Sequence, residues 1–582
     1  MATESFFSNA SLAYLASAGA GKDGKTYSIK PTDGSGDFTF SRGSNLSATR
    51  VGPTGLIEKG RENLLLQSNA FSTSPWTDVT ASVTSGQTGY DGSNDAWLLE
   101  KSGSSGRILQ SISAVSGVYT YSVYAKEGAS NSILLLLDAS ADAYAYFNLS
   151  AGTLLSNSNI IDGYITDAGN GWYRVSVLVN ITSFDRVRIY PAQGADTSAT
   201  TGSIYIQDAQ VEIGLAATDY IESGATTGKA GLLEDEPRFD YSGGATCPSL
   251  LLEPSRTNSL GQSEYFDGYY TKFASGITYD TNTSETTSPE GLYNATKLIS
   301  STNNEQQAIY KNVAVATPTL TCYAKAGEFD TFALKLSGSV FCNFTLTGNG
   351  STGYSANISD KSIEPVGNGW YRCSISATSD SIYAWIAIAG GGIQGDGTSG
   401  IYIYGAQLEA GRYPTSYIPN HSGGSVTRGA DACNGAGDAS TFNSTEGVLY
   451  AEISAIDNEL TYKEVSLSDG TSSNRIEIRY LQNKIEFTAR ISGVSEVYAN
   501  FTPSSVFDFN KIALRYNGTD FKLYLNGSLV ATDTSVNTFS ANTLNSAQFN
   551  SGAGASVFYG NAKQVLVFNE ALSDADCITL TT

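Results

Sequence analysis

The sequence predicts an all-β protein with two tandem β-sandwich jelly rolls followed by a third, separate sandwich. Apolar and polar residues alternate over many short segments, and clusters of Gly, Ser, Asn and Asp separate these segments. Helical periodicity is almost absent. A chain of 582 residues has room for about three to five domains, so we expect several hydrophobic cores.

An internal repeat defines two of these domains. The segment Asn-Gly-Trp-Tyr-Arg at 170–174 recurs at 368–372, and Tyr-Ala-Lys at 124–126 recurs at 323–325. Because the order of such matches is kept along the chain, two copies of one fold are expected. The predicted domains are an N-terminal attachment segment (1–50), a first jelly roll called repeat 1 (51–228), a linker with a second jelly roll called repeat 2 (229–430), and a C-terminal domain (431–582).

Both repeats contain half-buried strands of period two. In repeat 1 the residues Tyr173, Val175 and Val177 alternate with more polar neighbours, and repeat 2 has the same pattern from Tyr371 onward. We therefore expect Tyr173 and Tyr371 in the two cores. Trp172 and Trp370 are expected on the opposite face of the strand.

The C-terminal domain is predicted to be an antiparallel meander. Alternating segments are joined by Asn517-Gly518 and by Asn526-Gly527. Asn-Gly is the preferred two-residue hairpin turn because both turn positions require positive φ. These turns predict neighbouring antiparallel strands between about 510 and 530.

Composition excludes several classes of protein. The net charge is −22 and no block of Lys or Arg interrupts it, which excludes a protein that tracks nucleic-acid phosphates. No apolar run reaches the roughly 18 residues of a membrane span, so membrane insertion is not expected. The N-terminus lacks the basic start of a secretory signal, and the six cysteines have neither disulfide nor metal-site spacing. These features predict buried free thiols and a protein that is made in a cytoplasm and released by lysis.

Several segments resemble known families. The stretch 516–527 with 567–574 resembles the concanavalin-like, laminin-G-like lectin domain found in many phage proteins, and the repeated unit resembles a carbohydrate-binding-module jelly roll. The stretches 36–58 and 250–258 are similar to linkers in tail and head appendage proteins of tailed phages. The resemblance implies a head or tail fiber on the virion surface that binds host or mucosal glycans.

The resemblance also predicts how such an appendage is held. Its N-terminus is expected to order mainly against other virion proteins. A homodimer or homotrimer is expected, because weak glycan contacts gain avidity when several are presented together. Two alternatives stay open: a structural capsid or tail decoration that binds no sugar, and a glycan depolymerase.

No catalytic motif has the context that it needs, so we expect no enzyme and no cofactor. Segment 19–26 satisfies the phosphate-loop pattern, but a β-prone segment ended by proline follows in place of a helix. His421 is the only histidine, and its Gly- and Ser-rich surroundings predict a solvated linker residue. Glu452, Asp457 and Glu459 do not reproduce the carboxylate spacing of concanavalin-like glycosidases. A structural calcium ion in loops such as 91–95 stays open beside an ordinary turn.

Four aromatic residues of repeat 2 form the candidate ligand site. The apolar residues of 382–388 and 401–403 alternate with Tyr383, Trp385, Tyr402 and Tyr404. A short connection suggests that the two strands are neighbours, so these rings are expected to form one platform for a sugar on the face away from the core. A subunit interface, or burial of the rings, is the alternative. Repeat 1 has Arg186, Arg188, Tyr205 and Gln207 at the corresponding positions.

Overall fold

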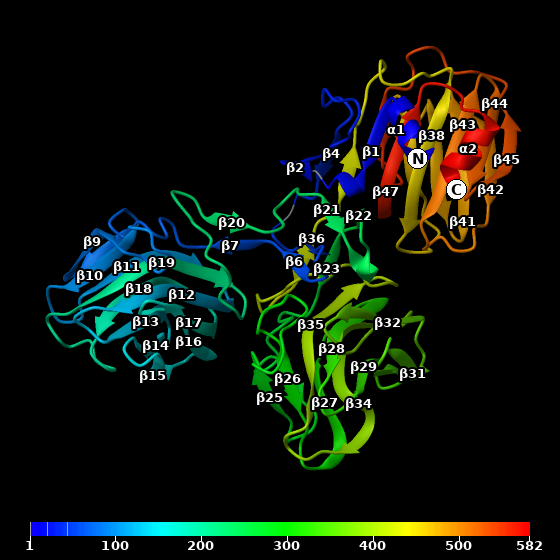
Figure 1. Cartoon of the computed structure of the whole chain (residues 1–582). Coiled ribbons are helices and arrows are strands. Elements are labelled where there is room, and N and C mark those ends of the chain that lie inside the picture. Colours follow the sequence, from blue (N-terminus) through cyan, green and yellow to red (C-terminus); the bar gives the residue numbers. More distant parts are fainter. Residues whose placement is uncertain (1, 20, 44) are drawn as a thin grey trace. The chain divides into compact units, whose positions relative to one another are not determined.

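The computed structural model describes residues 2–19, 21–43 and 45–582. The chain forms two compact units, of which the first comprises 1–58, 234–256 and 427–582 and the second comprises 59–233 and 257–426. Nearly all regular structure is strand, and it forms several sandwiched sheets (Figure 1). The predicted all-β fold class is therefore confirmed.

Repeat 1 is a sandwich of two six-stranded sheets in the second unit. One sheet has the order β16-β17-β12-β19-β10-β9 and the other the order β15-β14-β13-β18-β11-β8. The strands are β8 Trp76–Val79, β9 Ala81–Gln87, β10 Ala96–Lys101, β11 Arg107–Ala114, β12 Gly117–Glu127, β13 Ser132–Ala139, β14 Ala143–Asn148, β15 Thr153–Ser158, β16 Asp162–Gly169, β17 Trp172–Ile181, β18 Phe184–Ala192 and β19 Ser203–Ile213.

Repeat 2 has the same topology, strand for strand. Its sheets have the orders β32-β33-β28-β35-β26-β25 and β31-β30-β29-β34-β27-β24, which are those of repeat 1 with every number raised by 16. The strands are β24 Thr271–Lys272, β25 Thr278–Thr281, β26 Thr296–Ile299, β27 Asn304–Lys311, β28 Pro318–Ala326, β29 Thr331–Ser337, β30 Val340–Thr345, β31 Ser351–Ala356, β32 Asp360–Gly367, β33 Trp370–Ser376, β34 Ala384–Gln394 and β35 Gly400–Ala410. The tandem repeat that the sequence predicts is confirmed.

The repeated Trp-Tyr pair lies as the alternation predicts. Tyr371 is in the core of repeat 2 and its hydroxyl donates to the Gly348 carbonyl at 2.7 Å, whereas Tyr173 is only half-buried against the core of repeat 1. Trp172 and Trp370 are buried outside these cores, and the Trp370 indole donates to the Thr287 carbonyl at 2.8 Å. The shared motif is therefore structural in both repeats.

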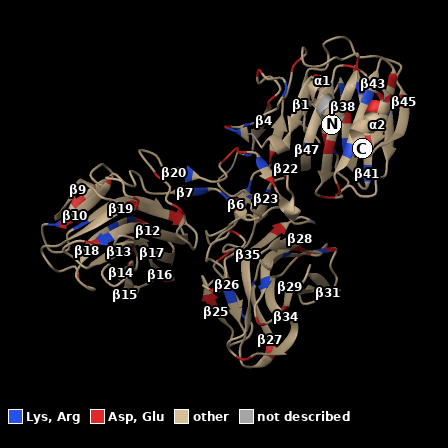
Figure 2. Cartoon of the chain, in the orientation of Figure 1, with Lys and Arg blue, Asp and Glu red and all other residues tan. Residues whose placement is uncertain are grey.

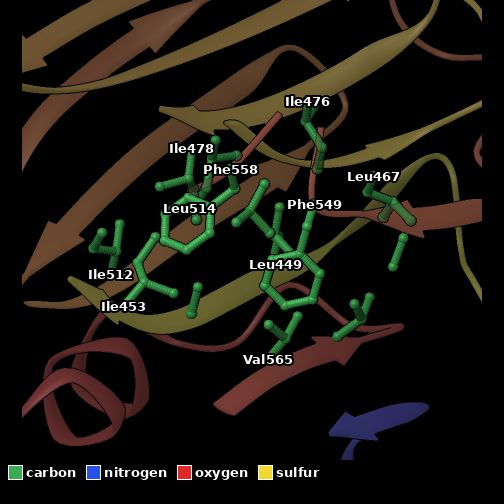
Figure 3. Packing of buried hydrophobic residues seen from close by; sticks show 14 of the residues in the cluster. Leu449, Ile453, Leu467, Ile476, Ile478, Ile512, Leu514, Phe549, Phe558 and Val565 are labelled. Carbon is green, nitrogen blue, oxygen red and sulfur yellow. The ribbon is translucent and has the colours of Figure 1, made fainter. Parts of the chain in front are cut away.

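The C-terminal domain is the main sandwich of the first unit. Its larger sheet has the order β21-β22-β47-β38-β43-β44-β45, and its smaller sheet the order β42-β41-β40-β39-β46. Figure 3 shows residues such as Leu449, Ile478 and Leu514 facing one another in the core between these sheets. The strands are β21 Arg238–Asp240, β22 Ser249–Leu252, β38 Glu446–Ala455, β39 Lys463–Ser468, β40 Arg475–Leu481, β41 Lys484–Ile491, β42 Val494–Phe501, β43 Asn510–Asn517, β44 Asp520–Leu525, β45 Ser528–Thr534, β46 Ser546–Gln548 and β47 Gly560–Phe568, followed by α2 Asp574–Thr581.

Both predicted hairpins are present, and one turn differs by a residue. Asn526 and Gly527 both have positive φ between the paired strands β44 and β45. Asn517, in contrast, pairs with Asp520, so the first turn consists of Gly518 and Thr519. Gly518 alone supplies the positive φ there, at 60°.

The N-terminal segment is part of the first unit, which corrects the expectation that it orders mainly against other proteins. Strand β1 (Leu12–Leu15) pairs antiparallel with β47, beside which it lies in Figure 1. Tyr14 and Phe38 belong to the core of the C-terminal sandwich. The segment is too short to build a core of its own, but it completes a core whose other residues lie hundreds of positions away. That contribution has no local signal in the sequence.

The remaining helices and strands of the chain are short, and two of them lie in the segment with the phosphate-loop pattern. Within the phosphate-loop pattern, Ala20 lies outside the described residues, and the rest of the pattern forms a two-stranded hairpin that opens no helix. The short elements are α1 Ala2–Asn9, β2 Gly21–Lys22, β3 Lys25–Thr26, β4 Phe38–Ser41, β5 Thr49–Val51, β6 Ile57–Lys59, β7 Arg61–Asn63, β20 Gly228–Ala230, β23 Arg256–Asn258, β36 Val426–Arg428 and β37 Ala432–Asn434.

A buried ion cluster joins three separate segments of the first unit. Arg238 and Arg428 both reach the Glu253 carboxylate, at 2.6 and 2.8 Å. Asp431 pairs with Arg238 and, at 3.4 Å, with Arg42. Removing one partner of such a cluster leaves a buried charge uncompensated, so the cluster fixes how these segments meet.

The dispersed charge agrees with the sequence expectation, and so do five of the six cysteines. Basic positions are scattered over the sheets among acidic ones (Figure 2). All six cysteines are free thiols, and five of them are buried; Cys247 is exposed. Among the described residues, no helix is long and apolar enough to cross a membrane.

Candidate functional site

The four predicted platform residues do not share a surface, which corrects the predicted site. Strand β34 carries Trp385 and strand β35 carries Tyr402 and Tyr404, but the two strands lie in opposite sheets of the sandwich. The alternation itself is confirmed, because Ile386 and Ile403 face the core between the sheets. The loop between the strands crosses from one sheet to the other instead of forming a hairpin.

The hydroxyls of Tyr402 and Tyr404 are bound by carboxylates from loops of repeat 2. The Tyr402 hydroxyl donates to Glu285 at 2.5 Å. Tyr404 is fully buried, and its hydroxyl lies 3.0 Å from Glu264 and 2.7 Å from Glu290. Both tyrosines therefore have structural partners, and Tyr404 offers no surface to a ligand.

Tyr383 and Trp385 belong instead to an aromatic patch on the outer face of the other sheet. Trp385 is 7% exposed, and three aromatic rings surround it. Their centroids lie 4.7 Å (Phe273), 5.3 Å (Tyr310) and 5.5 Å (Tyr383) from that of Trp385. Phe273 is 52% exposed, so it presents this group to solvent.

Cross-strand register extends the patch over the sheet. Tyr310 pairs with Trp385, Trp385 with Lys335, and Lys335 with Phe341, so these side chains form one row across four strands. Phe341 in turn packs at 5.5 Å against Tyr354, which is 72% exposed. We call Phe273, Tyr310, Tyr383, Trp385, Lys335, Phe341 and Tyr354 the outer patch of repeat 2.

A row of small residues lies beneath the outer patch. Ala308, Ala387 and Ala333 pair across the same three central strands, two positions along from the row of Trp385. Together with Trp385 they form a buried apolar cluster. Because alanine side chains are short, the large indole has space against the sheet.

The Trp385 indole N–H has no hydrogen-bond partner and is shut off from solvent. A buried donor without an acceptor costs about 1–3 kcal/mol. The indoles of Trp76, Trp97 and Trp370, in contrast, all donate to backbone carbonyls. The floor of the outer patch therefore keeps one donor that the fold does not satisfy.

The same face of repeat 1 has different chemistry. Arg188 occupies the position of Trp385; it pairs with Asp138, and its guanidinium donates to the Tyr190 hydroxyl at 3.1 Å. Leu136 occupies the position of Lys335, and Tyr144 that of Phe341. This face of repeat 1 carries leucines and tyrosines, and the cation at the position of Trp385 is neutralised by Asp138.

Sequence reasoning missed Phe273, Tyr310, Lys335, Phe341 and Tyr354. A signal was present, because Lys335 and Phe341 stand at polar-side positions of two alternating strands. Phe273 follows the two-residue strand β24, and β31 around Tyr354 is mostly polar, so neither segment has an apolar alternation that assigns a face.

His421 is not a solvated linker residue, so the expectation for it is wrong. Its side chain is 5% exposed within the second unit, and its Nε2 lies 3.4 Å from a Glu264 oxygen. Lys59 Nζ lies 3.0 Å from Glu264, and the Tyr417 hydroxyl donates to the same carboxylate at 2.9 Å. Burial alone would raise the pKa of Glu264, but the charges of Lys59 and His421 hold that pKa well below its ordinary value.

A second group of ionisable residues lies on the outer face of the smaller sheet of the C-terminal domain. Burial, and then the neighbouring Glu477 carboxylate, raise the pKa of Glu464 to about 8. Arg475 pairs with Glu477 at 2.5 Å, and Arg479 lies 3.9 Å from Glu464. A carboxyl group that stays protonated at neutral pH beside a carboxylate suits acid–base chemistry as well as structure.

The carboxylates singled out in the sequence have other partners. Asp457 pairs with Lys463 at 2.6 Å, and Glu452 accepts from the Gln564 amide at 2.6 Å. In the 91–95 loop, Asp91 accepts from the Ser93 amide at 3.0 Å. Among the described residues, no group of three or more His, Cys, Asp or Glu side chains is arranged to hold a metal ion. The structural calcium ion stays a prediction.

One known protein family is similar to the C-terminal part of the chain. The family described as the concanavalin A-like lectin/glucanases superfamily matches residues 455–577, which confirms the concanavalin-like fold of the C-terminal sandwich. No curated protein is detectably similar to the chain.

Solved structures resemble parts of the chain. A carbohydrate-binding module (CBM40) of the IT-sialidase of Ruminococcus gnavus, bound to α2,3-sialyllactose, is 19% identical, with 26% of this chain and 94% of that one covered and a TM-score of 0.23. Domain 4 of an extracellular arabinanase from Geobacillus stearothermophilus, in complex with arabinotriose, is 10% identical, with coverage of 26% and 73% and a TM-score of 0.23. The binding domain of botulinum neurotoxin serotype G is 12% identical, with coverage of 43% and 50% and a TM-score of 0.22.

Proposed function

We propose that the chain is a glycan-binding adhesion protein, and that the outer patch of repeat 2 is its sugar-binding site. The observation that carries the proposal is the aromatic outer patch, in which Phe273 and Tyr354 are exposed and the Trp385 indole N–H has no partner. An exposed apolar patch of this kind marks a binding surface more often than a scattered aromatic residue does. The match of the C-terminal domain to a family of lectins and glucanases supports a carbohydrate role.

The chemistry of the outer patch suits a pyranose ring. The C–H groups on one face of a sugar pack against aromatic rings, while its hydroxyls seek donors and acceptors around the edge. Phe273 and Tyr354 provide exposed rings at two ends of the patch, and Tyr310 and Tyr383 provide half-buried hydroxyl-bearing rings. A ligand that moves the covering rings aside gains the Trp385 N–H as a donor.

We also propose that the protein is an appendage on the virion surface of a tailed phage. The supporting observations are the appendage-like segments 36–58 and 250–258 and the low content of charged residues, 15%. In this proposal the exposed part of the first unit docks on other virion proteins, and two or three copies of the chain present their sites together. Adhesion requires no catalytic residue and no cofactor.

A glycan array with the full-length chain tests the adhesion proposal. Phe273→Ala with Tyr354→Ala removes the two exposed rings and is expected to reduce binding at least tenfold with little change in melting temperature. Tyr293→Ala is the matched control, because Tyr293 is 60% exposed in the same repeat and lies outside the outer patch. Undiminished binding by the double variant, or absence of any glycan ligand, would refute the proposed site and leave a structural decoration.

Glycan hydrolysis is the second candidate function. It is favoured by Glu464, whose pKa is raised to about 8 by burial and by neighbouring Glu477, and by the glucanases in the matching family. Release of reducing ends from glycans that bind the chain, lost in Glu477→Gln, would establish it. Binding without release supports adhesion alone.

A further inference from the structure

Lys335 is the one basic side chain in the row that crosses the outer patch. It stands between Trp385 and Phe341 in the cross-strand register. Its Nζ lies 5.5 Å from the centroid of the Trp385 ring and 5.4 Å from that of Phe341. The amine therefore sits over aromatic faces, which attract cations.

No carboxylate neutralises Lys335. Within the described part of the chain, no Asp or Glu oxygen lies within 4.0 Å of its Nζ. Lys297, on the opposite sheet of the same repeat, is neutralised, with Glu285 at 2.9 Å and Glu328 at 3.1 Å. Lys325, which is also partly buried, donates to the Thr286 hydroxyl at 2.9 Å. Lys335 differs from both lysines because its amine lies between two aromatic rings.

The partial burial of Lys335 has a free-energy cost that an anion would offset. Burial lowers the pKa of Lys335, because a charged amine loses hydration at this position. A ligand anion in contact with the amine would replace that hydration with a charge-assisted hydrogen bond, a stronger contact than a neutral one. Such a ligand would otherwise be repelled by a chain of net charge −22, so a local cation is needed where it binds.

We infer that the glycan bound by the outer patch is acidic, and that a carboxylate on its sugar ring pairs with Lys335 while the ring packs on the aromatic side chains. The inference rests on the proposed function, because it assigns the ligand class of that same site. Repeat 1 has Leu136 at this position, and the nearby Arg188 is already paired with Asp138. Another outer-face cation of repeat 1, Arg107, lies 5.5 Å from the centroid of a single ring, that of Tyr190. Repeat 2 is the repeat whose row places a cation between two aromatic rings.

Matched glycan pairs test the inference. The full-length chain is titrated with oligogalacturonate and its methyl ester, and with sialylated and desialylated forms of one oligosaccharide, by calorimetry. The acidic member of at least one pair is expected to bind roughly 10-fold to 100-fold more tightly, the range for a hydrogen bond to a charged group. That preference should weaken as salt is raised, since the amine is only partly buried.

Substitution of Lys335 separates the inference from the proposed function. Lys335→Gln should bring the affinity for the acidic glycan down to that for its neutral partner, and Lys335→Arg should keep most of the preference. Lys361→Gln is the matched control, because it removes a lysine of the same repeat outside the outer patch.

The possible outcomes test the acidic-glycan inference and the proposed site separately or together. Equal binding of acidic glycans by the chain and by Lys335→Gln overturns the inference while the site stands. Loss of all binding in Phe273→Ala with Tyr354→Ala, together with an unchanged affinity in Lys335→Gln, supports the site with a neutral ligand and overturns the inference. Dimerisation that is lost in Lys335→Gln, with no glycan bound, would show that a second copy of the chain covers the patch and would overturn both.

Discussion

The two repeats share one topology but present different outer faces on equivalent sheets. In repeat 1, Arg188 is held by Asp138 and by Tyr190, among leucines and tyrosines. In repeat 2 the equivalent residue is Trp385, and the neighbouring Lys335 lacks a carboxylate partner. The comparison teaches that one scaffold can carry a face whose central cation is neutralised by a carboxylate and a face whose central cation is not. A face with an unneutralised cation is where an anionic ligand gains most.

The largest loss of unfolding free energy should come from the core of repeat 2, and the equivalent change in repeat 1 should cost less. Tyr371→Ala removes a ring buried in the core of repeat 2 and its hydrogen bond to Gly348, and should cost about 3–5 kcal/mol of unfolding free energy. Tyr173→Ala should cost about half as much, because Tyr173 is only half-buried. Calorimetric unfolding of both variants measures the difference; a near-neutral Tyr371→Ala would contradict the core assignment.

Substitution of the outer-face residue should also cost more stability in repeat 2 than substitution of the equivalent residue in repeat 1. Trp385→Ala removes a ring that packs against alanines and is expected to cost about 3 kcal/mol. Arg188→Ala removes a partly exposed ion pair and should cost about 1 kcal/mol or less. Trp385→Phe keeps a ring and deletes the unsatisfied N–H, so it should be the mildest change. A larger loss from Arg188→Ala than from Trp385→Ala would invert the comparison.

A smaller effect should appear in the pH dependence of stability. Asp208 of repeat 1 has φ 54° at a bulge where repeat 2 has Gly405, with φ 61°. Burial raises the pKa of Asp208 to about 7, with Asp95 and Asp91 contributing. A folded-state pKa above the unfolded value means that the folded state binds more protons, so stability should fall as pH rises from about 4 to about 7, on the order of 2 kcal/mol.

Replacing Asp208 by glycine copies repeat 2 at this position. Asp208→Gly should flatten the pH dependence and relieve the left-handed strain, although the Tyr90 hydroxyl loses its acceptor at 3.0 Å. Urea unfolding at pH 4.5 and pH 7.5 measures this. An unchanged difference between the two pH values in the variant would show that another group titrates.

The sequence predicts local faces better than it predicts which strands meet. Alternation correctly placed Ile386 and Ile403 in the core, because a strand exposes every second residue on each side. It could not tell that the loop between Trp385 and Tyr402 crosses between sheets, since a short connection fits a hairpin and a crossover equally well. The predicted platform failed for that reason.

Long-range packing was also outside the reach of the sequence. Tyr14 and Phe38 complete a core built mostly by residues after 430, and His421 is buried beside Glu264. Glycine and serine around His421 looked like a linker because composition reports local flexibility and not what packs against it. The repeat itself was predictable, because matched motifs recur in order.

The central claim is that the outer patch of repeat 2, and not the equivalent face of repeat 1, binds a glycan. The five tryptophan indole N–H signals report on this directly in a glycan titration followed by NMR. The signal of Trp385, assigned with Trp385→Phe, should shift with saturation, while those of Trp76, Trp97, Trp172 and Trp370 stay in place. A bound glycan that shifts a repeat 1 signal and leaves that of Trp385 unchanged would contradict the account.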